Sequence, residues 1–389
     1  MGWLGRIFGS RKRREQRRET EERLRAALEA DGADATWPAL VEALREDPDS
    51  DELYRLASHA LRLAGAPRLA VFFDRAADAP HDAQRLFELG SELLSEDEPD
   101  AAVAVLERAL ALAPFDAVAR SELALAHARR GDPDKVLATL ALHPCLADDP
   151  GALFELAWAS LLKGDLDTAE DAARELHGAP QLRHKLELAI DRGRASGPAR
   201  DARDFYFVEH GGVLVDATGA LAGRHDALTV DADWLGTTLR DAGAVVERLL
   251  PRPRRILALD AAHRPLAEAL AATCDGTVLE PGRGRLPAAV LPLWDGSLVE
   301  SRLDAASLKA EGIWLFALTV DHRASLARAP EIVGAFTREA TLADGLAPEA
   351  SDKPPSSTLL DYVDHRRDYL PPRGDRVRAA YVPDAPLPK

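Results

Sequence analysis

Cysteine is nearly absent from this chain of 389 residues, because only Cys145 and Cys274 occur and they lie far apart. Two isolated cysteines exclude a disulfide framework and a cysteine metal site, and they indicate a reducing compartment. No apolar run approaches the roughly 18 residues that a membrane-spanning helix needs. The start of the chain lacks the pattern of a signal peptide, since its cations follow the short apolar segment instead of preceding it. These absences predict a cytoplasmic protein.

Cations are scarce relative to acids beyond residue 18. The formal net charge is −16, yet residues 1–18 hold seven cations against one anion, so residues 19–389 carry −22. A body this acidic repels phosphates, which argues against general nucleic-acid binding. Methionine occurs once and arginine is favoured over lysine, a composition that indicates a GC-rich bacterial genome.

The basic head, residues 1–19, has an amphipathic pattern. On a helix its apolar residues share one face, beside a run of cations. An apolar helix face beside cations is suited to binding an anionic membrane surface. This pattern predicts a peripheral location on the inner face of the membrane. The expected contacts are Trp3, Leu4, Ile7, Phe8, Arg11, Lys12, Arg13 and Arg14. Two alternatives stay open: a disordered head whose aromatics dock on the body, or a basic arm that continues into the first helix.

A repeat of about 34 residues follows the head. Segments with the turns GDLD, GDPD and DEPD align, and with a fourth segment their starts fall near 51, 83, 117 and 150. Such a period is typical of stacked helical hairpins. Degenerate helices before residue 51 and a closing helix at PQLRHKLELAIDRGRAS extend the predicted array to residues 20–195.

These repeats resemble the tetratricopeptide (TPR) family over about residues 51–182. The copy from residue 83 matches best: Leu86, Leu89, Gly90 and Leu93 are followed by Ala102, Leu106, Ala109 and Pro114. Small Gly90 and Ala102 would let the two helices approach closely, and Pro114 would end the second.

The resemblance implies that the first helix of each repeat lines a concave groove that binds a protein partner. One end of this groove is expected to be basic and the other apolar, which would suit an amphipathic helix or an extended segment with an acidic part. An alternative reading buries Phe154 and Trp158 under the following domain. The implied groove residues are Arg55, His59, Arg62, Phe87, Ser91, Leu94, Leu125, Arg129, Phe154, Trp158 and Leu161.

Strand and helix patterns alternate after a linker at about residues 196–200. We expect a hairpin over DFYFVEHGGVLVDATG, then strands at RRILALD, GTVLE, LPAAVLPLWDGS and IWLFALTV with helices between them. This alternation predicts a small α/β domain over residues 201–335 with a mostly parallel, Rossmann-like sheet. The predicted fold class is therefore a multidomain chain, an all-α TPR solenoid followed by an α/β domain.

Ligands of parallel sheets bind beyond the carboxyl ends of the strands. The predicted ligand loop there consists of Asp260, His263, Arg264, Asp295 and Ser297. The order of elements faintly resembles phosphoribosyltransferases, but the segment WDGSLV has one acid and lacks the family's paired acids and TGxT-like loop. The resemblance therefore implies a degenerate domain without catalytic residues, and we expect no metal site and no cofactor.

Residues 336–389 are rich in proline and predict an extended tail with one helix at STLLDYVDHRRDYL. Leu359, Leu360, Tyr362 and Val363 of this helix are expected to dock on the body. The sequence favours a non-enzymatic TPR adaptor or scaffold that binds a protein partner. The alternative is an enzyme or a nucleotide or phosphosugar sensor that uses the α/β domain.

Overall fold

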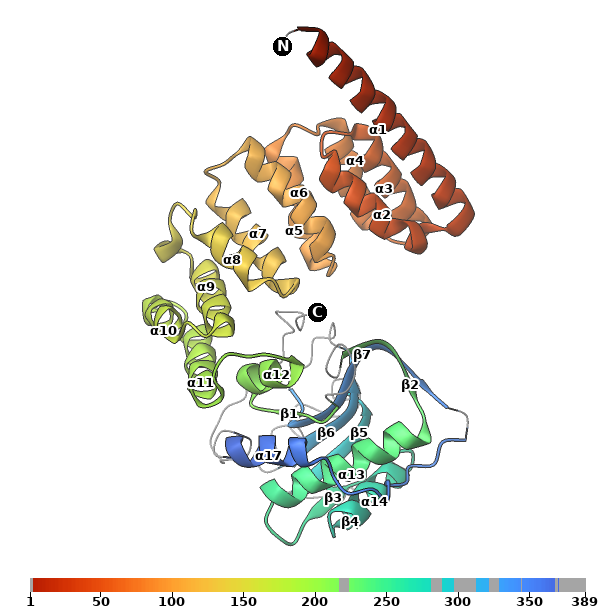
Figure 1. Ribbon diagram of the computed structural model, residues 1–389, viewed down its shortest axis with the longest axis vertical. Coiled ribbons are helices and arrows are strands. Elements are labelled where there is room, and N and C mark those ends of the chain that lie inside the picture. Colours follow the sequence, from red (N-terminus) through yellow and green to blue (C-terminus); the bar gives the residue numbers. More distant parts are fainter. Residues whose placement is uncertain are drawn as a thin grey trace. The chain divides into compact units, whose positions relative to one another are not determined.

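A computed structural model describes residues 3–216, 224–280, 289–296, 313–321, 329–343, 345–367 and 370, with side chains for all of these except residues 3–16, 224, 226, 338 and 339. The chain divides into two compact units, Met1–Glu155 and Leu156–Lys389. The boundary predicted at residues 196–200 therefore lies inside the second unit. Figure 1 colours the elements along the sequence.

The first unit is built of consecutive helices. Its last helix, α9, crosses the boundary between the units. The elements are α1 (Trp3–Asp31), α2 (Ala33–Glu46), α3 (Asp51–Leu63), α4 (Pro67–Asp78), α5 (Ala83–Ser95), α6 (Pro99–Leu112), α7 (Ala117–Arg129), α8 (Pro133–Leu140), the short 3₁₀ helix η1 (Leu146–Asp148) and α9 (Pro150–Lys163).

Local sequence signals define three helical hairpins in this unit, α3 with α4, α5 with α6 and α7 with α8. The first helices, α3, α5 and α7, begin after the capping residues Ser50, Asp82 and Asp116, whose side chains accept hydrogen bonds from backbone N–H groups. The second helices, α4, α6 and α8, each begin with proline, which needs no hydrogen-bond acceptor at that position. The predicted TPR-like helical repeat is confirmed in this unit.

Close approach of the two helices in a hairpin depends on a missing side chain at Gly90. A Cβ atom placed there would lie 2.5 Å from Cγ of Leu106 on α6. Leu106 is fully buried, as are Leu86, Leu89 and Ala102 around it. The predicted role of the small residue at this position is thus borne out by the packing.

The second unit begins with further helices and continues into a sheet. The helices are α10 (Leu166–Glu175), α11 (Pro180–Ser196), α12 (Ala202–His210), α13 (Ala232–Leu249), α14 (Arg264–Thr273) and α17 (Ser357–Arg366). The strands are β1 (Val213–Leu214), β2 (Arg224–Val230), β3 (Arg255–Leu257), β4 (Thr277–Leu279), β5 (Ala289–Asp295), β6 (Ile313–Val320) and β7 (Ile332–Leu342).

The sheet has the order β1-β7-β6-β5-β3-β4, with β2 also paired to β7. Every pairing between the described strands is parallel. All eight residues of β6 are buried, as expected for a central parallel strand covered on both faces. Helices α13 and α14 pack against each other and on the sheet. The predicted parallel α/β architecture is confirmed, including the strands at RRILALD, GTVLE, LPAAVLPLWDGS and IWLFALTV.

Two predictions about this unit are wrong. The expected hairpin is instead helix α12 followed by β1, which pairs in parallel with β7. The loose tail expected from residue 336 is also wrong in part, because β7 continues to Leu342 and pairs with β2 as far as that residue. The helix expected between the strands at LPAAVLPLWDGS and IWLFALTV, over SRLDAASLKAEG at residues 301–312, lies outside the described residues.

Helix α17 docks on the second unit as its sequence predicts. Leu359 and Val363 are fully buried, whereas Leu360 and Tyr362 are half-buried. The helix packs against α13, and the segment before it lies along the same helix, since the backbone N–H of Ser351 donates to the carbonyl of Gly236. The segment that follows β7 is therefore part of the folded unit as far as α17.

Candidate functional site

The predicted groove residues of α3, α5 and α7 lie at the protein surface. Arg55, His59 and Arg62 of α3 are exposed. Phe87 and Ser91 of α5, and Leu125 and Arg129 of α7, are half-buried. Together these seven residues form the groove face.

Two cations of the groove face are neutralised by acids of the same unit. Arg55 pairs with Asp51 at 2.6 Å between nitrogen and oxygen. Arg62 pairs with Asp74 at 2.5 Å, and its guanidinium holds the pKa of the Asp74 carboxyl below the ordinary value. The predicted basic end of the groove is thus less basic than its sequence implies, which weakens the expectation of an acidic partner segment.

The other four predicted groove residues are packing residues, and this part of the prediction is wrong. Leu94, Phe154, Trp158 and Leu161 have exposed fractions of 2%, 5%, 4% and 3%. The ammonium of Lys185 lies 5.6 Å from the ring centroid of Trp158. The alternative reading, in which Phe154 and Trp158 are buried, therefore describes them better.

A Ser-His-Asp cluster that the sequence analysis missed joins α7 to the turn after α8. Ser121 Oγ lies 2.9 Å from His143 Nε2 and 2.6 Å from Asp149 Oδ2. The three residues are separated by 22 and 28 positions in the chain, so no local motif could reveal them.

The geometry of this cluster does not activate Ser121 as a nucleophile. The backbone N–H of Cys145 donates to His143 Nδ1 at 3.3 Å, so the ring proton is assigned to Nε2, which faces the serine. The serine hydroxyl then donates to Asp149. Burial alone would raise the pKa of the Asp149 carboxyl. Hydrogen bonds from Ser121 and from backbone N–H groups together outweigh burial, so the pKa lies below its ordinary value. Asp149 also caps α9 through Ala152, so the cluster fixes a turn.

The predicted ligand loop follows β3, beside the carboxyl end of β5. His263 Nδ1 lies 2.7 Å from Asp260 Oδ1, and this hydrogen bond is the main reason that the pKa of Asp260 is lowered to about 2. His263 is 3% exposed, and its Nε2 has no hydrogen-bond partner among the described residues. Trp294 Nε1 donates to the carbonyl of Ala262 at 3.3 Å, which joins β5 to this loop.

Of the remaining members of the predicted ligand loop, Arg264 bonds to acids outside that loop. Arg264 pairs with Glu268 and Glu280. Asp295 is the last residue of β5, and Ser297 lies outside the described residues. No group of three residues able to hold a metal ion occurs where the structure describes the chain.

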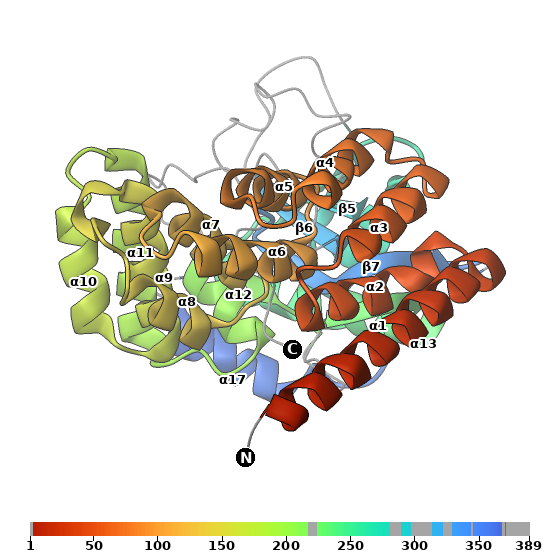
Figure 2. The ribbon, with the colours of Figure 1, turned by 90° about the horizontal axis from the view of Figure 1, so that it is seen from above.

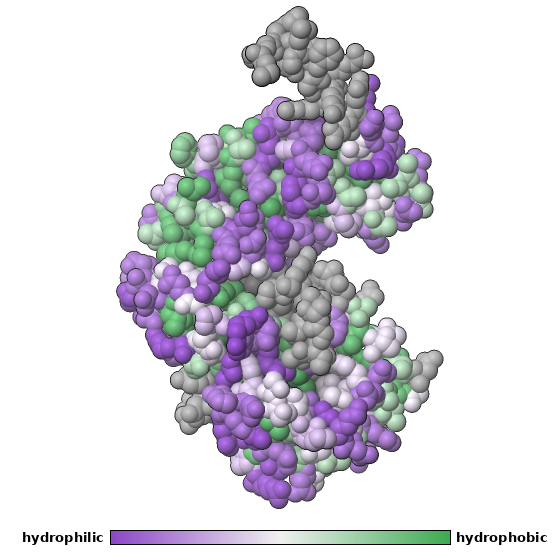
Figure 3. Space-filling view, viewed as in Figure 1, coloured by the Kyte–Doolittle hydropathy of each residue, from purple (hydrophilic) through white to green (hydrophobic). Residues whose placement is uncertain are grey.

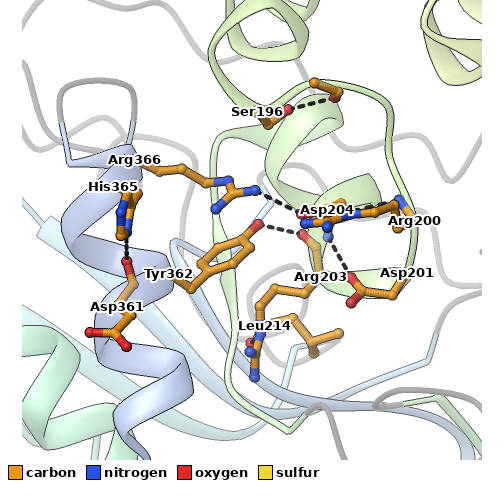
Figure 4. Close-up of polar contacts among 11 residues, drawn as sticks. Ser196, Arg200, Asp201, Arg203, Asp204, Leu214, Asp361, Tyr362, His365 and Arg366 are labelled. Atoms are coloured by element: carbon orange, nitrogen blue, oxygen red, sulfur yellow. Dashed lines mark hydrogen bonds and ion pairs between the residues drawn. The ribbon is translucent and has the colours of Figure 1, made fainter.

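A buried ionic cluster links α17 to α12 (Figure 4). Arg366 Nη2 donates to Asp204 Oδ1 at 3.0 Å, and the guanidinium lies 3.9 Å from the ring centroid of Tyr362. Tyr362 donates in turn to the carbonyl of Arg203 at 3.0 Å. Arg203 donates to the carbonyls of Leu214 and Val215. Because these polar groups bond to one another, we assign the cluster a structural role.

The side chains that make up the amphipathic face predicted for the head are outside the described part of the structure. Its backbone is the first part of α1. Among the helices that the structure describes, none is long and apolar enough to cross a membrane.

Comparisons with known proteins add little to this geometry. No protein-family model matches the chain, and no curated protein matches it either. This chain is similar to the solved structure of TTC0263, described as a thermophilic TPR protein in Thermus thermophilus, at 21% sequence identity and a TM-score of 0.28. The similar region covers 44% of this chain and 97% of that chain. It is also similar to the solved structure of PilW, described as a widely conserved type IV pilus biogenesis factor, at 17% sequence identity and a TM-score of 0.29. That similar region covers 49% of this chain and 90% of that chain. At these TM-scores neither likeness supports a functional argument.

Proposed function

We propose that this chain is a non-enzymatic scaffold that binds a protein partner through the groove face of its TPR-like hairpins. The observation that carries the proposal is a stripe of half-buried residues that continues from α5 to α7. Phe87 and Leu125 pack against the core with one side and remain accessible on the other. Arg129 Nη1 donates to the carbonyl of Leu94, which brings the ends of the two helices together.

The composition of this stripe suits a protein ligand. Aromatic residues, phenylalanine among them, and arginine are enriched at protein interfaces relative to the rest of the surface, and the stripe offers Phe87 and Arg129. The cations of α3 already have acidic partners, so apolar contacts with Phe87 and Leu125 would supply most of the affinity.

Capture of partners from a native lysate tests the proposal. We expect Phe87→Ala to weaken capture of a specific partner by about tenfold or more, the loss typical of a truncated interface anchor. Phe72→Ala is the matched control, because Phe72 is also a half-buried phenylalanine but lies on the second helix α4. Equal capture by both variants, at unchanged thermal stability, would refute the proposed role of the groove face.

A second candidate function is binding of a small ligand at the 260–263 loop, and the specific observation that favours it is His263. Since Nδ1 donates to Asp260, Nε2 is a buried acceptor, and a ligand hydroxyl or amide that reached it would satisfy it. A nucleotide or phosphosugar carries such hydroxyls.

Thermal unfolding with a panel of nucleotides and phosphosugars tests this second function. A ligand at 100 times its dissociation constant would stabilise the protein by about 2.7 kcal/mol, and His263→Ala should abolish that shift. A shift that persists in His263→Ala, or no shift with any compound, would rule out a role for this histidine.

A further inference from the structure

Three exposed apolar side chains lie together at one edge of the helical unit. Phe115 is 86% exposed, Leu142 is 70% exposed and Val118 is 59% exposed. Phe115 lies in the turn between α6 and α7, Val118 in the first turn of α7, and Leu142 just after α8. These three residues form the edge patch, and Figure 3 shows hydrophobic residues on this side of the helical unit.

The hydrogen-bonded cluster around Ser121 holds the turn after α8, which carries Leu142, against the N-terminal half of α7, which carries Val118. Val118 is one helical turn before Ser121, and Ser121 bonds to His143, which follows Leu142 in the chain. The turn that carries Phe115 is held by polar contacts, since Arg120 Nη2 donates to the carbonyl of Pro114 at 2.6 Å. Because the three side chains of the patch are mostly exposed, they contribute little to the stability of the fold. A patch of this kind is characteristic of an interaction site.

Acids border the edge patch. Asp116 adjoins Phe115, and Asp148 and Asp149 follow the turn that carries Leu142. The nearby cation Arg120 is only 9% exposed and is turned toward Pro114. A complementary partner segment therefore has apolar side chains flanked by cations.

The first residues of this same chain have that chemistry. Residues 3–14 contain Trp3, Leu4, Ile7 and Phe8 together with Arg6, Arg11, Lys12, Arg13 and Arg14. Residues 1–18 carry +6, whereas residues 19–389 carry −22. Two copies would repel each other through their bodies, and contact between a head and a body is the arrangement that opposite charges favour.

The helix α1 carries the head beyond the surface of its own helical unit. The later turns of α1 are anchored, because Leu24 and Leu28 are buried and Arg17 pairs with Asp47 at 2.5 Å. Figures 1 and 2 show that the first turns extend past the helices on which α1 packs, and that α1 and α8 lie at opposite ends of the helical unit. A straight helix of 29 residues is about 44 Å long.

We propose that residues 3–14 of one copy dock on the edge patch of a second copy. Such head-to-body contact uses different surfaces on the two copies, so it allows assembly to continue beyond a dimer. It also gives the basic head a role that requires no membrane. This self-association is independent of the groove face and so goes beyond the proposed function.

Sedimentation velocity of the full chain over a range of concentrations tests the proposal. We expect concentration-dependent association that weakens as salt is raised, because the contact pairs opposite charges. Phe115→Asp and Leu142→Asp should each weaken it by about tenfold or more, as loss of an interface anchor does. Leu63→Asp is the matched control, since Leu63 is 59% exposed on α3 of the same unit, and this variant should associate like the unaltered protein.

A synthetic peptide of residues 1–18 then identifies the docking segment. The full chain with Ile7→Glu and Phe8→Glu should remain monomeric yet bind the labelled peptide, and adding Phe115→Asp should abolish peptide binding. A monomer at every concentration would overturn the proposal, as would association that Phe115→Asp leaves unchanged. Binding of the peptide to vesicles of anionic phospholipid without binding to the chain would also overturn it, in favour of a membrane contact.

Discussion

Replacing Asp204 by alanine is expected to destabilise the second unit by about 3–5 kcal/mol, the usual cost of removing one partner of a buried ion pair. Asp204 is 2% exposed and Arg366 is 9% exposed. The carboxylate accepts from Arg366 at 3.0 Å and from the backbone and side chain of Arg200 at 3.2 and 3.3 Å (Figure 4). Without it a buried guanidinium has lost its counter-ion, and α17 loses its polar attachment to α12.

Urea unfolding followed by tryptophan fluorescence measures this effect. The double variant Asp204→Ala, Arg366→Met should recover part of the loss, because it removes the stranded charge and keeps an apolar side chain near Tyr362. Asp364→Ala is the matched control on the same helix, since the pair between Arg248 and Asp364 is exposed and should contribute at most about 1 kcal/mol. A cost for Asp204→Ala no larger than that of the control would contradict the structural role of the cluster.

Gly334→Ala is expected to cost about 3 kcal/mol or more, at the upper end of what overpacking a core causes. A Cβ atom on Gly334 of β7 would lie 2.2 Å from the carbonyl oxygen of Leu318 on β6 and 3.0 Å from Cγ2 of Thr238 on α13. Relief would require movement of the backbone in the centre of the sheet. The added methyl group should therefore weaken the pairing of β6 with β7 and the packing of α13 together.

Thermal unfolding compares this variant with Gly178→Ala, where an added Cβ meets nothing within 4 Å. We expect the control to unfold at or near the temperature of the unaltered protein. Equal unfolding temperatures for Gly334→Ala and the control would show that β6, β7 and α13 are packed less closely than the structure indicates.

The repeat unit was predictable from sequence because its signals are local. Capping aspartates, prolines at the start of second helices and small residues such as Gly90 recur at a fixed period. The groove positions implied by the family resemblance include seven residues that lie at the surface of α3, α5 and α7, and their contact with a partner stays a prediction. Three of the implied positions failed on α9, because PGALFELAWASLLK is apolar over most of its surface, and such a helix is buried on most sides.

The predicted hairpin failed because Gly211-Gly212 has another use. Gly211 ends α12 with a φ of 67°, a left-handed conformation that suits glycine. A Cβ atom on Gly212 would lie 2.4 Å from the ring of Tyr206 and 3.1 Å from the carbonyl oxygen of Pro330. The pair therefore ends a helix and admits a close contact with a segment more than one hundred residues away, which no local rule detects.

Strand β7 was missed for a related reason. It begins at Ile332, beside Glu331, in a segment where the sequence analysis expected no further strand. Glu331 is 1% exposed, and its carboxylate accepts from the backbone N–H of Leu315 at the start of β6. Burial of this acid depends on a neighbouring strand. Long-range partners of the same kind, Ser121 with Asp149 and Asp204 with Arg366, account for the clusters that sequence reasoning did not find.

The central claim is that the groove face of the TPR-like hairpins binds a protein partner. Photo-crosslinking in the full chain tests this claim most directly. A photoreactive amino acid at Ser91 of α5 or at Leu125 of α7 should form a covalent product with the captured partner. The same group at Val71, which is 42% exposed on the second helix α4, should form none. A product from Val71 alone, or no product from Ser91 and Leu125 while the partner remains bound, would contradict the account.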